Sequence, residues 1–137
     1  MTPATSDAPI VVLDSSVGVK WIKHEAGRDQ ALALLKSHRD GTARIVVAAQ
    51  FTHELVAVAV RRGGSALGRR TWDALSAARL TTIGLDDRLA SRALEQCERL
   101  GCSFYDALAP ALARDLAATL YSADARAHSQ FEGVRLV

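Results

Sequence analysis

The stretch IVVLDSSVGVKW, residues 10–21, decides how the rest of this chain is interpreted. Its first four residues are apolar and mostly β-branched, as in a strand that is buried on both faces. The strand leads directly into Asp14, and a second apolar pattern follows after two serines. Strands of this kind are typical of parallel sheets, in which ligands bind beyond the carboxyl ends of the strands. We therefore expect the carboxylate of Asp14 to lie at a ligand-binding edge.

Short apolar runs alternate with helical patterns along the rest of the chain. Gly63-Gly64 and Gly101 each end a helical pattern, as glycine commonly does. The alternation predicts an α/β fold, a single domain with a five-stranded parallel sheet flanked by helices on both faces. The expected strands are 10–13, 44–48, 80–83, 118–121 and 134–137, and the expected helices are 16–23, 26–39, 50–62, 65–79, 87–100 and one that begins after Ser103.

Length and composition fit one ordinary globular domain. The chain has 137 residues, of which 49% are hydrophobic and 23% are charged, as in chains that fold around a core. Residues 1–9 resemble a flexible tail without the features of a secretory signal, so the domain is expected to span 10–137. No apolar run is long enough to cross a membrane, and we expect a cytoplasmic protein. Cys97 and Cys102 have neither zinc-ligand nor redox-motif spacing.

Four acidic residues stand in apolar or sharply structured surroundings, unlike the other acids of the chain. Asp14 follows the first strand and Asp124 follows the fourth. Glu54 lies in an otherwise apolar helix, and Asp106 lies in the first turn of another. All four can reach the same edge of the sheet. Any two carboxylates about 4 Å apart repel each other by roughly 4 kcal/mol at an effective dielectric near 20. A divalent cation would offset this repulsion, and oxygen ligands suit Mg²⁺ or Mn²⁺.

Each of these acids also has a purely structural explanation when it is taken alone. Asp14 could cap the helix that follows it, Asp106 could be an ordinary first-turn acid, and Asp124 could belong to a turn. Taken together, they favour a metal site. Pro110 complicates the position of Asp106, because proline cannot donate to the carbonyl four residues earlier, which is that of Asp106, and usually bends a helix.

The basic residues are a weaker signal for a polyanionic partner. With the four acids set aside in a metal site, 17 basic residues face 15 − 4 = 11 acidic ones, an excess that suits nucleic acid but also simple solubility. Arginines flank the GGSALG turn, where they could bind RNA phosphates or remain solvated helix ends. The four histidines show no metal-ligand spacing. The candidate RNA contacts are Lys20, Arg61, Arg62, Arg69 and Arg70.

Four segments, in this order, resemble PIN-domain proteins and in particular the VapC-type toxins of bacterial toxin–antitoxin pairs. They are VVLDSSVGVKW, HELVAVAVRR, SFYDALAPALARDL and ATLYSADARAHSQFEGVRLV, and the resemblance extends over residues 10–137. It implies a PIN-like nuclease domain, an endoribonuclease that uses Mg²⁺ or Mn²⁺ and metal-activated water to hydrolyse RNA phosphodiester bonds. The matching catalytic and metal-binding acids are Asp14, Glu54, Asp106 and Asp124, and the matching supporting hydroxyls are Ser15, Ser16 and Ser122.

The resemblance also implies partners, namely a second copy in a homodimer and a VapB-type antitoxin that places a basic side chain among the acids. The chain departs from the family at Ala48-Ala49, where a proline is common, and at Ala57, where an asparagine often follows the glutamate. A catalytically weak or inactive PIN-fold module that binds RNA or protein is therefore the alternative. A phosphatase of the haloacid dehalogenase type fits poorly, because its second aspartate would fall at Ser16.

Overall fold

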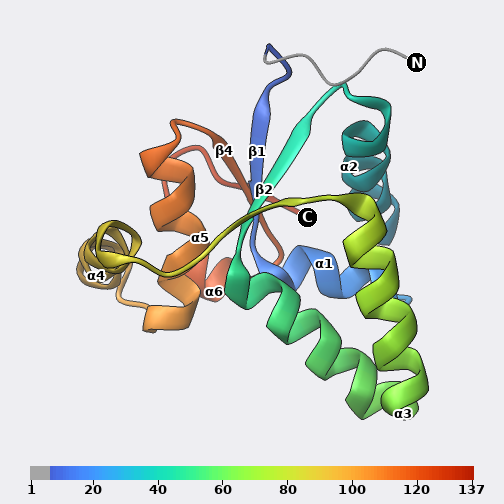
Figure 1. The fold of residues 1–137 in the computed structure, drawn as a ribbon. Helices are drawn as coiled ribbons and strands as arrows, with labels where there is room; N and C mark the ends of the chain where they lie inside the picture. The colour runs from blue at the N-terminus through green and yellow to red at the C-terminus, as the bar shows by residue number, and fades with distance from the viewer. Residues whose placement is uncertain (1–6) are drawn as a thin grey trace.

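The computed structural model describes residues 7–137 and confirms the predicted α/β architecture (Figure 1). Five parallel strands form one sheet in the order β3-β2-β1-β4-β5. Of the predicted tail at 1–9, residues 1–6 lie outside the described residues. The strands are β1 (Ile10–Leu13), β2 (Arg44–Ala48), β3 (Thr81–Ile83), β4 (Thr119–Ser122) and β5 (Arg135–Leu136). The helices are α1 (Ser15–Ile22), α2 (Arg28–Asp40), α3 (Ala49–Ala78), α4 (Asp87–Leu100), α5 (Phe104–Asp115) and α6 (Ala125–His128).

Helices α1, α2 and α3 cover one face of the sheet (Figure 1). Alternate residues of the central strands, such as Val11 and Ile45, pack there against large side chains that include Phe51. Helices α1 and α3 approach closely at Gly18, because a Cβ atom at that position would lie 2.5 Å from Cζ of Phe51 and 2.9 Å from Leu55. Only glycine fits this crossing without displacing its neighbours.

Helices α4 and α5 cover the opposite face of the sheet (Figure 1). Val12, Val46 and Leu120 point towards them, and every residue of α5 from 107 to 113 is buried. Alanine occupies four of those seven positions, so the helix can lie close to the strands. This close packing brings the N-terminal turn of α5 to the carboxyl edge of the sheet.

Helix α3 consists of two arms, as the glycine pair in the sequence predicts. Gly63 and Gly64 have non-helical backbone angles, and Gly64 has a φ of +69°, which favours glycine. The chain changes direction sharply at this point, and the two arms form a V (Figure 1). The described part of the chain, residues 7–137, contains no helix with the length and hydrophobicity that spanning a membrane requires.

Candidate functional site

The predicted acids are distributed around the carboxyl edge of the sheet, on the loops and helices that follow the strands. Asp14 comes directly after β1, and its N–H donates to the carbonyl of Tyr121 over 3.0 Å, which continues the pairing of β1 with β4. Its side chain is the N-cap of α1 and accepts a hydrogen bond of 3.0 Å from the N–H of Ser16. The capping role considered for Asp14 is therefore real, and Ser16 is not the cap. With 8% of its surface exposed, Asp14 is fixed at this edge.

Glu54 lies about one turn into the first arm of α3, beside the start of α1. The Ser15 hydroxyl donates to one oxygen of its carboxylate, and the side-chain amide of Gln50 donates to the other. Ser15 follows Asp14 in the chain, so Asp14 and Glu54 form the first pair of acids at the site. The hydroxyl of Ser15 therefore contacts one of the predicted acids directly.

Asp106 and Asp124 form the second pair, because both line one cavity of about 280 Å³. The Ser103 hydroxyl caps α5 by accepting a hydrogen bond of 3.1 Å from the N–H of Asp106. Asp124 caps the short helix α6, which the sequence did not predict, by accepting a hydrogen bond of 3.1 Å from the N–H of Ala127. Both helix starts therefore direct acidic residues towards the same cavity.

A thiol and a guanidinium also line this cavity. Burial raises the pKa of the Cys102 thiol, and the nearby Cys97 and Asp106 raise it further. Cys102 therefore stays protonated at neutral pH, which does not suit a metal ligand. The exposed Arg126 lies on the rim of the cavity with Asp106 and Asp124. Arg126 was not among the basic residues predicted from the sequence.

Hydrogen-bonded hydroxyls connect the segments that carry Asp14 and Asp124. Ser122 is fully buried, and its Oγ accepts a hydrogen bond of 3.0 Å from the N–H of Asp124. Ser16 Oγ lies 3.5 Å from Ser122 Oγ and accepts a hydrogen bond of 2.9 Å from the N–H of Ala123. Ser122 Oγ also lies 2.6 Å from Nδ1 of His128. Because this network links α1, β4 and α6, it fixes the relative positions of the segments that carry Asp14 and Asp124.

Two further members of the site were missed in the sequence. His128 is fully buried behind the acids, and Gln50 holds the carboxylate of Glu54. The only signal for Gln50 was its position one turn before Glu54 on the same helix. His128 belongs to a short helix without a recognisable pattern, so nothing local indicated its role.

Lys20 has a different role from the predicted RNA contact. Its side chain is almost buried, and Nζ donates a hydrogen bond of 2.5 Å to the carbonyl of Ala26. Nζ also lies 3.4 Å from a carboxylate oxygen of Glu25. The ammonium group therefore fastens the end of α1 to the following loop and is not available to an RNA phosphate.

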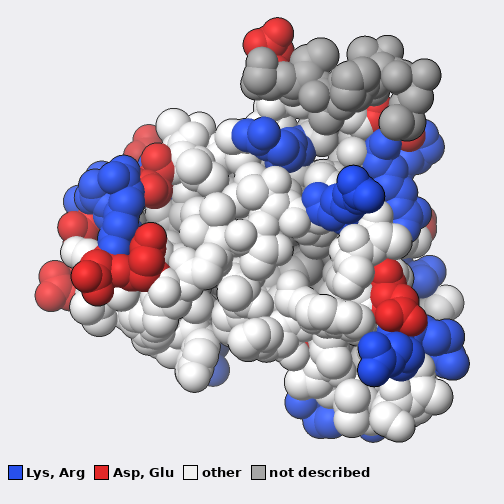
Figure 2. Space-filling view, viewed as in Figure 1, with Lys and Arg blue, Asp and Glu red and all other residues white. Residues whose placement is uncertain are grey.

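The four candidate arginines lie two on each arm of α3, on either side of the glycine pair. All four are exposed, and Figure 2 shows basic side chains gathered around the tip of α3. Within residues 7–137, none of the four forms an ion pair. We name this surface the arginine tip, and its members are Arg61, Arg62, Arg69 and Arg70.

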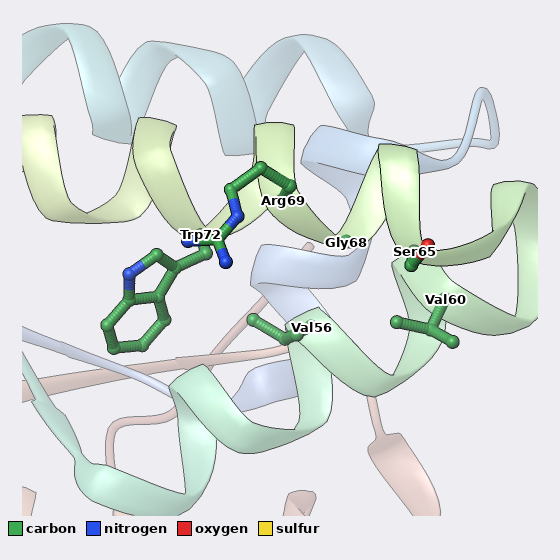
Figure 3. A pocket seen from close by; sticks show the side chains of 6 residues that line it. All are labelled: Val56, Val60, Ser65, Gly68, Arg69 and Trp72. Carbon is green, nitrogen blue, oxygen red and sulfur yellow. The ribbon is translucent and has the colours of Figure 1, made fainter.

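A groove of about 350 Å³ runs between the two arms (Figure 3). Val56 and Val60 line it from the first arm, and Arg69 and Trp72 line it from the second, where the two side chains lie next to each other in Figure 3. The arms meet at Gly68, where a Cβ atom would lie 2.7 Å from Val60. The groove places an exposed indole ring beside the arginine tip.

The chemistry of the acid groups fits a hard divalent cation. The donors are carboxylate and hydroxyl oxygens, which suit Mg²⁺ or Mn²⁺. In the described chain, none of the four acids forms an ion pair with Lys, Arg or His. Residues 7–137 contain no group of three His, Cys, Asp or Glu side chains that could hold one ion. Mg²⁺ is commonly bound by one or two carboxylates together with water and substrate phosphates, and Asp106 and Asp124 line one cavity.

Comparison with known proteins identifies the family. The model of the PIN domain matches residues 11–133, which is most of the chain. The chain therefore belongs to the PIN domain family, as its sequence motifs suggested. No curated protein sequence matches the chain.

Several solved structures share the fold. A toxin–antitoxin complex from Klebsiella pneumoniae has a TM-score of 0.72 at 18% identity, with 91% of this chain and 95% of that chain covered. VapC20 of Mycobacterium tuberculosis, a toxin that cleaves the sarcin–ricin loop, has a TM-score of 0.69 at 17% identity, with 91% and 98% covered. VapBC2 of Rickettsia felis, bound to a DNA fragment from its promoter, has a TM-score of 0.67 at 19% identity, with 93% and 97% covered. At these identities the likeness establishes the fold.

Proposed function

We propose that this protein is a metal-dependent endoribonuclease and the toxin component of a VapBC-type toxin–antitoxin module. The observation that carries the proposal is the cavity shared by Asp106 and Asp124, which the hydrogen-bonded Ser122 and Ser16 connect to Asp14. None of these four acids forms an ion pair within the described residues, so the site suits a cation. The shared fold with toxins, one of which cleaves an RNA loop, supports the same activity.

The four acids have different proposed roles at the site. Asp106 and Asp124 would hold Mg²⁺ or Mn²⁺, with Asp14 and Glu54 completing the site from the α1 and α3 side. A bound divalent ion supplies activation of the attacking water and positive charge opposite the phosphodiester. The hydroxyls of Ser15, Ser16 and Ser122 hold the acids and the adjacent backbone in place.

Basic side chains would orient the RNA. Arg126, on the rim of the cavity, can donate to a phosphate next to the bond that is cut. The arginine tip lies on the same helix as Glu54, and Arg61 is seven residues further along it. Seven residues of helix span about 10 Å, so the tip can contact a phosphate a few nucleotides away from the cleaved bond.

The proposed partners follow from the same surfaces. A VapB-type antitoxin would block the site by placing a basic side chain among the unpaired acids. Solved structures with this fold include a toxin–antitoxin complex and a VapBC complex. A homodimer would cover large apolar side chains that are exposed in the single chain, including Leu85 (62% exposed), Leu94 (59%) and Tyr105 (64%). We place this activity in the cytoplasm, where RNA and antitoxin are both available.

The direct test is cleavage of a labelled RNA by the purified protein. We expect cleavage with Mg²⁺ or Mn²⁺, none with EDTA, and a loss of at least about 100-fold in Asp14→Asn. Asp29→Asn is the matched control, since Asp29 is exposed on α2, and it should cleave normally. Cleavage in EDTA, or a fully active Asp14→Asn variant, would contradict the mechanism.

The alternative, a PIN-fold module that binds without turnover, has one supporting observation. No three ligand side chains of the described residues are close enough to hold one ion together. This alternative predicts that the protein binds RNA equally well with and without divalent ions and cleaves no RNA tested. Cleavage that depends on Asp14 would exclude it.

A further inference from the structure

The proline inside α5 leaves one backbone group of the site without its helical partner. Pro110 has no N–H, so it cannot donate to the carbonyl of Asp106 four residues earlier. That carbonyl instead lies 2.6 Å from Nε2 of His128, which belongs to α6. His128 is fully buried, and it thereby satisfies a group that would otherwise be orphaned in the protein interior.

The second ring nitrogen of His128 contacts the segment of Asp124. Because a carbonyl can only accept, Nε2 carries the hydrogen, and in the neutral ring Nδ1 accepts from the Ser122 hydroxyl, which is 2.6 Å away. The oxygen of that hydroxyl accepts the N–H of Asp124. A single imidazole therefore connects the backbone of Asp106 to the backbone of Asp124 through one hydroxyl.

We propose that His128 is a positioning residue, which sets the separation of Asp106 and Asp124 and thereby the affinity of the site for a divalent ion. The inference rests on the proposed function. A rigid buried ring with two hydrogen bonds of 2.6 Å allows little variation in the distance between the segments it joins. Residues that orient metal ligands in this way typically change metal affinity by about 10- to 100-fold when they are removed.

The chain contains a second histidine with the same kind of bonding, which serves as a control. Nδ1 of His38 accepts a hydrogen bond of 3.1 Å from the N–H of Ile45, and Nε2 lies 2.8 Å from the carbonyl of Ala78. His38 thus bridges α2, β2 and the end of α3 without contact to any of the four acids. Removal of its hydrogen bonds should lower stability alone.

The test compares His128→Phe with the double variant His128→Phe/Pro110→Ala in the intact protein. Phenylalanine keeps the ring but removes both hydrogen bonds. In the double variant, the new N–H of residue 110 can bond the carbonyl of Asp106 as in a regular helix. That carbonyl then has a hydrogen-bond donor again, but the link from it to Ser122 is still missing. Binding of Mn²⁺ is measured by calorimetry, Tm is measured by thermal unfolding, and His38→Phe and Pro110→Ala are measured in parallel.

We expect His128→Phe to bind Mn²⁺ about 10- to 100-fold more weakly and to melt at a lower temperature. The double variant should regain Tm but not Mn²⁺ affinity, and His38→Phe should lose Tm alone. Unchanged Mn²⁺ affinity in His128→Phe, or affinity that returns together with Tm in the double variant, would overturn the positioning role while the proposed nuclease stands. A wild-type protein that binds no Mn²⁺ would overturn both.

Discussion

Glu54 and Asp106, one acid from each pair, are held in different ways, whereas the carboxylates of Asp14 and Asp124 both cap helices. On the α1 and α3 side, protein donors bind the carboxylates themselves, as Ser15 and Gln50 do for Glu54. On the α5 side, Asp106 is held through its backbone, by Ser103 and His128, and no hydrogen bond to its carboxylate is present within residues 7–137. Both carboxylate oxygens of Glu54 therefore accept hydrogen bonds from the protein, whereas within the described residues those of Asp106 accept none.

The largest expected effect tests this asymmetry directly. Asp106→Asn should reduce RNA cleavage and Mn²⁺ affinity by more than about 100-fold, because an available ligand is removed. Glu54→Gln should cost less, since the amide oxygen can still accept one of the two hydrogen bonds. Initial cleavage rates over a Mn²⁺ titration measure both variants. Equal losses in the two variants would mean that Asp106 and Glu54 do not differ in their contribution to the site.

The next effect concerns the packing that supports the α1 and α3 side. Gly18→Ala places a Cβ atom 2.5 Å from the ring of Phe51, and overpacking of this kind typically costs about 1–3 kcal/mol of unfolding free energy. Urea unfolding measures the decrease. Gly84→Ala is the control, because nothing lies within 4 Å of its Cβ position. A Gly18→Ala variant as stable as that control would show that the crossing of α1 and α3 can relax.

A moderate effect is expected when the arginine tip is neutralised. Replacing Arg61, Arg62, Arg69 and Arg70 with glutamine should weaken RNA binding and reduce its salt dependence. The slope of log K against log salt should become shallower by about 0.7 for each RNA phosphate that the protein no longer neutralises. Fluorescence anisotropy at several salt concentrations measures the slope. Stability should be unchanged, because these side chains are exposed. An unchanged slope would mean that the arginine tip does not contact RNA.

The smallest effect lies at the rim of the α4 and α5 side, far from the acids. Arg88 donates three hydrogen bonds of 2.8, 3.1 and 3.2 Å to Asp115, and this bonding holds the pKa of the Asp115 carboxyl below its ordinary value. A lowered carboxyl pKa stabilises the fold above about pH 4, and the contribution is lost as the pH falls through the folded pKa. Arg88→Gln should therefore lower the urea midpoint slightly at pH 6 and not at all at pH 2. A difference that persists at pH 2 would indicate a packing role instead.

Much of the fold was predictable because its signals are local. Short β-branched runs such as 10–13 and 44–48 became β1 and β2, and the glycine pair broke α3 where expected. The acids at the strand ends were predictable for the same reason, since a parallel sheet brings its carboxyl ends to one edge. Whether all four acids bind one ion stays a prediction.

The features that escaped prediction depend on contacts between distant segments. Lys20 was a candidate RNA contact, yet its ammonium lies against the carbonyl of Ala26. Asp14 caps α1, as one reading of the sequence allowed, but the bond from the N–H of Ala123 to the Ser16 hydroxyl joins residues that are far apart in the chain. No periodicity or spacing encodes such pairings, which arise when helices pack.

The sequence by itself determined the order of strands and helices and the placement of acids after strands, because backbone propensity and hydrophobic period act over a few residues. It also showed that Pro110 leaves the carbonyl of Asp106 without a helical donor. Only the tertiary structure decided which donor takes its place, because His128 comes from a segment 22 residues away. A buried polar group requires a partner, and the partner is chosen by packing in three dimensions.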